Sequence, residues 1–319
     1  MSRRAIIVVL ACLMTMGIMI GTVSAAYPEH TVNLIVPFNP GGAVDVTCRF
    51  LGEAVEKELG AKIVIMNKPG GGAVIGQTFV ANSAPDGYTL LAATSSLVTN
   101  SLTKDTTYTP QSFQPVAMYC FDPEIMVVSS ESKYKTAKEL LEASKEDALL
   151  LSTPGHSTSH HIAGMMLEKI TGAKFEYVHN DGAPQQVMQV LGGYTDVGLM
   201  AYGECQNQVK TGEFTVLAVA SEERSPDLPD VPTFRELGID LVYGAWRGIA
   251  APAGLPQPVL DKLADAFEKG INDPVFRERM AKAGYPVLYR SPEGFAEYIN
   301  KDTEAVAQIF KEIGIEKAK

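Results

Sequence analysis

Short apolar runs alternate with longer amphipathic stretches along the whole chain. Runs such as Val32–Val36 have the length of buried β-strands, and the stretches between them have the length of surface helices. This alternation predicts an α/β fold with mostly parallel sheets. Strands are predicted at Val32–Val36, Ile63–Met66, Tyr88–Ala93, Gln114–Cys120, Ile125–Ser129, Leu149–Ser152, Phe175–Val178, Asp196–Met200, Thr215–Ala220 and Tyr243–Ala250. Helices are predicted at Val44–Leu59, Ile75–Ser83, Ala137–Ser144, Ser159–Thr171, Pro184–Leu191, Gly203–Thr211, Gln257–Asn272, Asp273–Ala283 and Pro292–Ile313.

Residues 1–26 have the pattern of a secretory signal peptide. Two arginines precede the uncharged apolar stretch Ala5–Ile20, and Ser24–Ala26 supplies the small residues of a cleavage site. We expect cleavage after Ala26 and export to the periplasm. A lipoprotein signal ending at Cys12 fits less well, because too few apolar residues precede that cysteine. No later segment has the apolar length of a membrane span, so a soluble mature chain is expected.

Charge and cysteine content narrow the class of protein. Loss of the signal peptide removes two arginines and no acids, which takes the formal net charge from −10 to −12. An acidic chain argues against nucleic acid and anionic membranes as partners. Cys48, Cys120 and Cys205 remain, and they allow at most one disulfide within the chain. Buried free thiols are the simpler interpretation, and the cysteine spacing matches no metal site.

The length of the mature chain predicts two domains. About 290 residues are more than one hydrophobic core usually serves. The segments near Cys120–Glu124 and Val242–Trp246 lie at the two ends of a self-contained α/β block. We therefore predict one lobe from residues 27–121 and 246–319, a second lobe from residues 122–245, and two crossings between them. No internal repeat is present, and a monomer is expected.

Two glycine-rich loops carry the strongest local signal for binding. Pro37–Gly42 follows the first predicted strand, and Asn67–Gly72 follows the second; each precedes a predicted helix. Glycine lets the backbone approach a ligand closely, and the first amides of a helix lack partners within the helix. Together these features suit a carboxylate or a phosphate group. An ordinary strand–helix turn is the alternative interpretation of each loop.

An ordered set of motifs resembles one receptor family over essentially the whole mature chain. The motifs are Pro37-Phe38-x-Pro40-Gly41-Gly42-x-x-Asp45-x-x-x-Arg49, Asn67-Lys68-Pro69-Gly70-Gly71-Gly72-x-x-Ile75-Gly76, Ala84–Leu90, Thr158-Ser159-x-His161-Ile162-Ala163, Leu191-Gly192-Gly193-x-x-Asp196-Val197, Leu228–Thr233, Trp246-Arg247-Gly248 and Ala251-Pro252-x-Gly254. In this order they resemble the solute-binding receptors of tripartite tricarboxylate transporters, also called the Bug family.

The resemblance implies a two-lobed periplasmic binding protein of the type II, Venus-flytrap kind. Such a receptor closes on a small organic carboxylate and presents it to the permease subunits of a membrane transporter. It implies no enzyme activity, no cofactor and no metal. The candidate ligand-binding residues are Phe38, Asn39, Gly41, Gly42, Asp45, Gly71, Gly72, Thr94, Ser95, Thr153, Ser157, Thr158, Ser159, Asp181, Gly182, Asp196, Tyr202 and Arg247.

Several candidates have a structural alternative. Asp45 can pair with Arg49 at i,i+4, or it can bind the ammonium group of an amino-acid ligand. The hydroxyls of Thr94 and Ser95, and those within residues 157–159, can cap helices or donate to a carboxylate. Arg247 can grip a carboxylate with two bonds or form an ion pair between the lobes.

The second lobe departs from the family pattern. His179, Asn180 and Asp181 replace a segment that the family usually fills with a tyrosine, a lysine and glycines. Loss of a lysine and gain of an acid disfavour a highly charged tricarboxylate. Asp196 and Tyr202 are expected on the cleft floor, although Asp196 can also cap a strand end.

Histidines and an unusual tryptophan complete the set of candidates. His156 and His160 are four residues apart, but no carboxylate or cysteine lies nearby at ligand spacing, so no metal site is predicted. Trp246 is the only tryptophan in the chain and can stack on a ligand ring or pack between the lobes.

A hydrolase and a sensing receptor are the alternative functional classes. The chain lacks a Gly-x-Ser-x-Gly nucleophile motif and a phosphate loop ending in Gly-Lys-Ser/Thr, so a hydrolase has little support. A receptor that feeds a membrane sensor kinase would use the same binding chemistry. Neighbouring permease genes would favour transport, and a neighbouring kinase gene would favour sensing.

Overall fold

The computed structural model describes residues 27–156, 158–180 and 182–312. The expected signal peptide and two candidate residues, Ser157 and Asp181, lie outside this part of the chain. The strands are β1 (Val32–Val36), β2 (Ile63–Asn67), β3 (Thr89–Thr94), β4 (Phe113–Ser129), β5 (Leu149–Thr153), β6 (Phe175–His179), β7 (Val197–Ala201), β8 (Phe214–Val219), β9 (Gly244–Pro252) and β10 (Val287–Arg290). The helices are α2 (Ala43–Leu59), α3 (Val74–Ala81), α4 (Ser96–Thr103), α5 (Ala137–Glu146), α6 (Ser159–Thr171), α7 (Ala183–Leu191), α8 (Tyr202–Lys210), α9 (Gln257–Asn272), α10 (Pro274–Lys282) and α11 (Pro292–Glu312), with a short 3-10 turn, η1 (Pro110–Ser112).

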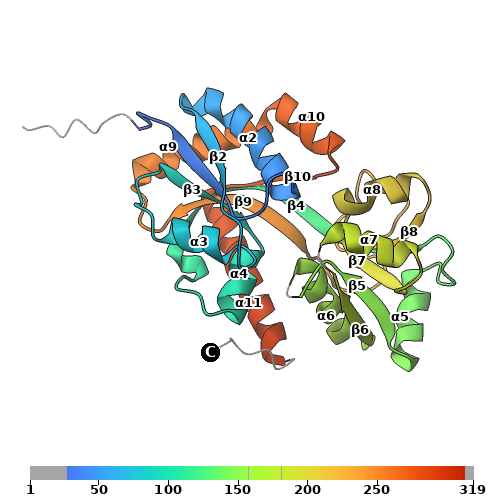
Figure 1. The fold of residues 1–319 in the computed structure, drawn as a ribbon. Coiled ribbons are helices and arrows are strands. Elements are labelled where there is room, and N and C mark those ends of the chain that lie inside the picture. Colours follow the sequence, from blue (N-terminus) through green and yellow to red (C-terminus); the bar gives the residue numbers. More distant parts are fainter. Residues whose placement is uncertain (1–26, 157, 181, 313–319) are drawn as a thin grey trace, which may run out of the picture.

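One continuous sheet runs through the molecule in the order β2-β1-β3-β9-β4-β7-β5-β6 (Figure 1). β1 pairs in parallel with β2 and β3, and β5 pairs in parallel with β6 and β7. The central strands β4 and β9 are antiparallel to each other and to their neighbours. The α/β class is therefore confirmed, but the sheet is mixed, because the two central strands run against the parallel sets.

Helices cover both parallel sets. Figure 1 shows α2, α3, α4 and α9–α11 with β1–β3, and α5–α8 with β5–β8. β1 is an apolar run because both of its faces are covered, and Leu34 is fully buried. α2 packs against α9, so Leu51 and Phe267 share one core cluster with β1. Gly60 ends α2 in the left-handed conformation at φ 76°, which an L-residue adopts reluctantly.

Three elements differ from the sequence prediction. The chain from Phe113 to Ser129 is one long strand, β4, rather than two strands, because β9 pairs with its first part and β7 and β8 with its last. Helix α4 was not predicted, since Ser96–Thr103 is rich in serine and threonine. Strand β10 was not predicted, because it is short and half-exposed and its apolar pattern is therefore weak.

The predicted domain boundaries fall inside β4 and β9, the two longest strands of the described residues. Residues 121 and 122 lie within β4, and residues 245 and 246 lie within β9, where Phe121 pairs with Trp246. The two-lobe division stays a prediction. Cys48, Cys120 and Cys205 are buried free thiols, as expected. Among the described residues, no helix has the length and apolar character that a membrane crossing needs.

Candidate functional site

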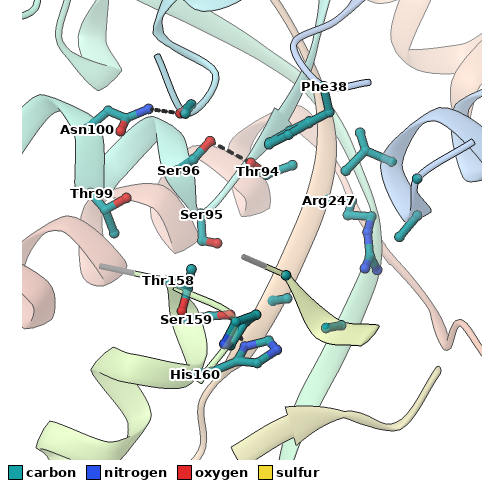
Figure 2. Close-up of a pocket in the computed structure, with 18 of the residues that line it drawn as sticks. Phe38, Thr94, Ser95, Ser96, Thr99, Asn100, Thr158, Ser159, His160 and Arg247 are labelled. Atoms are coloured by element: carbon teal, nitrogen blue, oxygen red, sulfur yellow. Dashed lines mark hydrogen bonds between the residues drawn. The ribbon is translucent and has the colours of Figure 1, made fainter. Parts of the chain in front are cut away.

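A cavity of about 890 Å³ lies between the loops that follow the parallel strands of the two sets. Its lining comes from segments far apart in sequence, and Figure 2 shows Thr94, Ser95 and Ser96 on one side facing Thr158 and Ser159 on the other. Ligands of open α/β sheets bind at this kind of position, outside the carboxyl ends of the strands. The full lining is Phe38, Gly42, Ala43, Val44, Gly72, Thr94, Ser95, Ser96, Thr99, Asn100, Thr103, Lys104, Pro154, His156, Thr158, Ser159, His160, Gly182, Ala183, Glu204, Ala245, Trp246 and Arg247.

Among the described residues, the N-termini of four helices line this cavity. Gly42 precedes α2, Ser95 precedes α4, Thr158 precedes α6 and Gly182 precedes α7, and each of these residues lines the cavity. The first backbone N–H groups of a helix have no partner within it, and the helix dipole places partial positive charge there. Four such ends around one cavity suit the binding of an anionic group.

The first glycine loop presents its last residue to the cavity. Gly42 has an ordinary φ of −76°, and a Cβ there would meet only the Asn39 carbonyl oxygen, at 3.6 Å. Gly41 instead adopts φ 81° and donates its backbone N–H to Asp45 Oδ2 at 2.9 Å. Phe38 lines the cavity beside Gly42, as expected for a wall. Gly41 therefore shapes the turn, and Gly42 faces the ligand space.

Asp45 braces this loop and does not line the cavity. It is 2% exposed and accepts bonds from Arg49 Nη2 at 2.9 Å and from Asn67 Nδ2 at 2.9 Å, in addition to Gly41. Burial raises the pKa of Asp45, but the bonds from Arg49, Gly41 and Asn67 outweigh it and hold the pKa below its ordinary value. The i,i+4 pair with Arg49 is thus formed, and an ammonium-binding role has no geometric support.

The second glycine loop turns carbonyl groups toward helix α4. Gly71 O accepts a bond from Lys104 Nζ at 2.9 Å, and Gly72 O accepts one from Asn100 Nδ2 at 2.7 Å. Gly72 lines the cavity and Gly71 does not. The sequence led us to expect the amide groups of both glycines at the ligand; their carbonyls instead anchor the loop to α4.

Helix α4 extends the polar wall that the predicted residues Thr94 and Ser95 begin. Thr94 Oγ1 and Ser96 Oγ lie 2.8 Å apart, and Gln77 Nε2 donates to Ser96 Oγ at 3.0 Å. Ser95 makes no side-chain cap bond, so capping does not occupy its hydroxyl. Thr99 and Asn100 extend this wall (Figure 2). In the sequence, the polar run after the third predicted strand indicated this wall.

The opposite wall is the start of helix α6. Thr158 Oγ1 donates to Gly155 O at 2.8 Å and accepts weakly from His161 N at 3.5 Å, so it does cap the helix. Ser159 Oγ lies 2.9 Å from His160 Nδ1. Both residues still line the cavity, because their helix begins at its edge. Capping and cavity lining are compatible here.

His160 is held between two carboxylates. Its Nδ1 lies 3.0 Å from Glu124 Oε1, and its Nε2 lies 2.8 Å from Glu204 Oε2. Burial lowers the pKa of His160, but the charges of Glu124 and Glu204 outweigh it and raise the pKa well above the ordinary value. The two carboxylates therefore favour the protonated form of His160, and both of its ring nitrogens are engaged.

Arg247 brings a buried positive charge to the cavity wall. It is 5% exposed and lies on β9, with its Nη1 2.9 Å from Cys120 Sγ and 3.8 Å from Asp122 Oδ2. Its guanidinium lies over the Tyr285 ring, 4.9 Å from the centroid. Arg247 thus forms an ion pair with Asp122, which is the structural alternative that the sequence offered for this arginine. Arg247 also lines the cavity. Trp246 beside it packs inward and donates to Asp302 Oδ2 at 2.8 Å.

Half of the predicted ligand residues line the cavity, and several lie elsewhere. Those lining it are Phe38, Gly42, Gly72, Thr94, Ser95, Thr158, Ser159, Gly182 and Arg247. In the described part of the chain, those outside it are Asn39, Gly41, Asp45, Gly71, Thr153, Asp196 and Tyr202.

Asp196 and Tyr202, which were expected on the cleft floor, do not line this cavity. Asp196 precedes β7, where it accepts a bond from Leu150 N at 2.9 Å, so it lies at the opposite edge of the sheet from the cavity. Tyr202 is 7% exposed and packs in a core cluster with Ile125 and Val219. Thr153 is fully buried at the end of β5. The residue that the sequence analysis missed in this region is Glu204.

Comparisons with known proteins agree with this geometry. Residues 47–315 match the model of the tripartite tricarboxylate transporter family receptor. The structure of the periplasmic binding protein BugD is 34% identical, with 92% of this chain and 100% of that chain covered and a TM-score of 0.75. A TctC solute-binding protein from Polaromonas is 29% identical, with 90% and 99% covered and a TM-score of 0.81. MatC from Rhodopseudomonas palustris with bound malate is 26% identical, with 89% and 99% covered and a TM-score of 0.74.

The family match spans most of the sequence, and the similar folds cover nearly all of the described residues. The resemblance noted in the sequence motifs is confirmed. The family consists of substrate-binding receptors and is not an enzyme class. This chain belongs to the tripartite tricarboxylate transporter receptor family of periplasmic solute-binding proteins.

Proposed function

We propose that the protein captures a small organic carboxylate in this cavity and delivers it to a tripartite tricarboxylate-type membrane transporter. The convergence of four helix N-termini on one cavity carries the proposal. Backbone N–H groups and serine and threonine hydroxyls hold the acid group, and Arg247 adds a charged contact for a second one. Because the chain is acidic overall, these local dipoles and not the net charge attract the anion.

The residues assigned to the ligand follow from the cavity walls. Gly42 at the start of α2 and Thr158 and Ser159 at the start of α6 line the same cavity, so we expect one acid group to accept bonds from both helix starts. Thr94 and Ser95 complete the donor set. Closure of the two walls would exclude water and strengthen each of these bonds as the local dielectric falls.

Closure itself is part of the proposal. The strands β4 and β9 connect the two parallel sets, and a small change in their twist would bring the cavity walls together. A volume of about 890 Å³ leaves room for a small acid with bridging water before closure. The ligand must bind the closed state more tightly than the open state for this motion to follow binding.

A thermal-shift screen tests ligand binding. The panel pairs dicarboxylates and tricarboxylates with their neutral amides, and C4 dicarboxylates come first because a similar protein binds malate. A ligand at a hundredfold over its dissociation constant stabilises the folded state by about 2.7 kcal/mol, which raises the melting temperature measurably. The proposal requires that acids shift the melting temperature and that their amides do not. Equal shifts from acid and amide would contradict an anion site.

Delivery is tested separately in cells. Uptake of the labelled acid is compared between the parent strain, a strain lacking this receptor and the same strain complemented with it. We expect uptake to fall without the receptor and to return on complementation. Unchanged uptake, together with a changed transcriptional response to the acid, would favour a sensing role over transport.

A further inference from the structure

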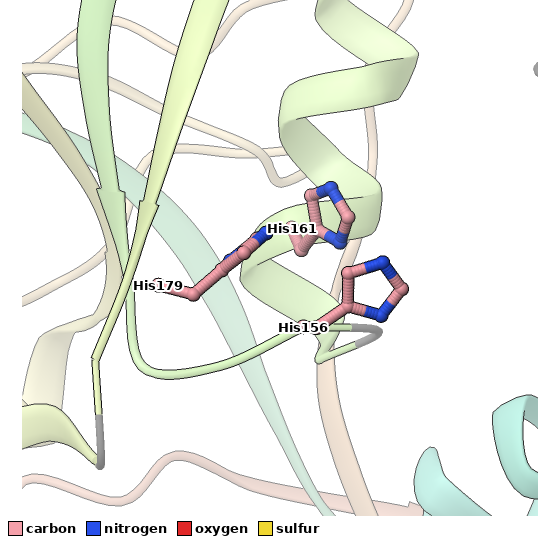
Figure 3. A group of neighbouring side chains, drawn as sticks. All are labelled: His156, His161 and His179. Carbon is pink, nitrogen blue, oxygen red and sulfur yellow. The ribbon is translucent and has the colours of Figure 1, made fainter.

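Three histidines gather beside the cavity. The ligand-capable atoms of His156, His161 and His179 all lie within 4.8 Å of one another. Their ring centroids are 4.6 Å apart for His161 and His179, 4.8 Å for His156 and His161, and 5.2 Å for His156 and His179. Figure 3 shows the three rings together at the start of α6 and the end of β6.

The fold brings these residues together from separate segments. β5 and β6 are parallel neighbours, and Thr153 at the end of β5 pairs in register with His179 at the end of β6. His156 follows β5 in the loop, and His161 lies in the first turn of α6. The carboxyl ends of parallel strands share one edge of the sheet, so the grouping depends on the backbone pairing. The spacing of His156 and His160, which we examined in the sequence, is not the relevant one.

One ring is already oriented as a ligand would be. His179 Nδ1 lies 2.7 Å from Thr153 Oγ1, and that hydroxyl donates its hydrogen to Gly155 O at 3.3 Å. This contact engages Nδ1 of His179, so coordination of a metal ion would use Nε2. Metal-binding histidines usually hydrogen-bond their second ring nitrogen in this way.

We propose that His156, His161 and His179 bind a divalent transition-metal ion of the Zn²⁺ class through three imidazole nitrogens. Imidazole suits Zn²⁺, Cu²⁺ and Ni²⁺, whereas Mg²⁺ and Ca²⁺ prefer oxygen ligands. Three protein ligands leave the fourth tetrahedral position open, and His156 also lines the cavity. The inference goes beyond carboxylate capture and does not depend on it.

The geometry requires only a small adjustment. At the usual Zn–N distance of about 2.0–2.1 Å, two tetrahedral nitrogen ligands lie about 3.3 Å apart. The present separations reach 4.8 Å, so the rings must approach by about 1.5 Å at most. His156 and His179 are exposed and can rotate toward His161, which is fixed in the helix and 5% exposed.

Calorimetric titration of ZnCl₂ into tag-free, chelator-treated protein tests the site. We expect one Zn²⁺ per chain with micromolar or tighter affinity. His156→Ala and His179→Ala change exposed side chains and should each weaken binding by at least about tenfold. His30→Ala is the matched control, because His30 is also exposed but lies elsewhere. Absence of saturable binding, or equal affinities in the His179 and His30 variants, would overturn the proposal.

Two further measurements test the geometry of the three-histidine site. Co²⁺ bound at three imidazoles should give the intense visible bands of a tetrahedral centre, and His161→Gln should abolish them while circular dichroism checks that the variant is folded. Thr153→Val should weaken Zn²⁺ binding, since it removes the bond that orients His179, and Thr153→Ser should retain it. Weak octahedral Co²⁺ bands in the wild type would contradict a three-histidine site.

Discussion

Asp122 gives the sharpest test of the electrostatics beside the cavity. It lies on β4, is fully buried, and neither carboxylate oxygen has a hydrogen-bond partner among the described residues. Its pKa is raised to about 7, chiefly by burial; Arg247 and His160 lower the pKa, and Glu204 and Glu124 raise it, within that result. The carboxyl group is thus partly protonated near neutral pH. Replacing it in Asp122→Asn gives a side chain of the same shape that does not titrate.

The sign and size of the effect follow from linkage. The folded-state pKa of about 7 exceeds the unfolded value of about 3.9, so the folded state binds more protons between these two values. The free energy of unfolding therefore falls as pH rises, by up to about 1.4 kcal/mol per pH unit. Integration from pH 5 to pH 8 gives a loss of about 2.5 kcal/mol from Asp122 alone. The asparagine variant lacks this loss.

Urea unfolding at pH 5, 6, 7 and 8 measures this pH-dependent loss in the free energy of unfolding. The free energy of unfolding comes from linear extrapolation of circular dichroism curves. We expect the difference between Asp122→Asn and wild type to rise by about 2.5 kcal/mol in favour of the variant from pH 5 to pH 8. His160, whose pKa is also raised, adds a loss of the same sign in both proteins and cancels to first order. Asp240→Asn, at an exposed aspartate, is the control and should show a constant difference.

A flat difference for Asp122→Asn across this range would refute the reasoning. It would mean that Arg247, whose Nη1 lies 3.8 Å from Asp122 Oδ2, compensates the burial fully. A difference that falls with pH would mean that the ion pair stabilises the fold, so that removing one partner leaves Arg247 buried without its anion.

Three other changes have expected outcomes. Gly42→Val should abolish carboxylate binding in the thermal-shift assay, because the valine side chain would enter the cavity. The melting temperature of the free variant should stay nearly unchanged, because the backbone conformation at position 42 suits any residue. Retained affinity would remove this loop from the site. Asp45→Ala should lower the free energy of unfolding at pH 7 by about 2 kcal/mol, because Gly41 N and Arg49 lose their hydrogen-bond acceptor. Urea unfolding measures this loss, and a change within the experimental error would contradict the bracing role of Asp45. The fluorescence emission of Trp246 should change with pH with a midpoint near 6, because burial raises the pKa of its hydrogen-bond partner Asp302 to about 6. This pH transition should vanish in Asp302→Asn. An unchanged transition in that variant would mean that another group causes it.

The sequence by itself determined most of the local structure. Apolar runs covered on both faces specify buried strands such as β1, and the loops Pro37–Gly42 and Asn67–Gly72 fall at the strand–helix turns that the motifs indicated. The family followed from the order of these motifs. Helix α4 escaped prediction because serine and threonine weaken a helical pattern, and packing of Leu97 and Val98 in the core outweighs that weak preference.

Only the tertiary structure decided which side chains meet. Strand pairing sets which loops share an edge of the sheet, and this placed Asp196 away from the cavity and His179 beside His156. It also turned the carbonyls of the second glycine loop toward Asn100 and Lys104. Residues far apart in sequence were brought together by strand register, and local propensity carries no information about register between distant strands.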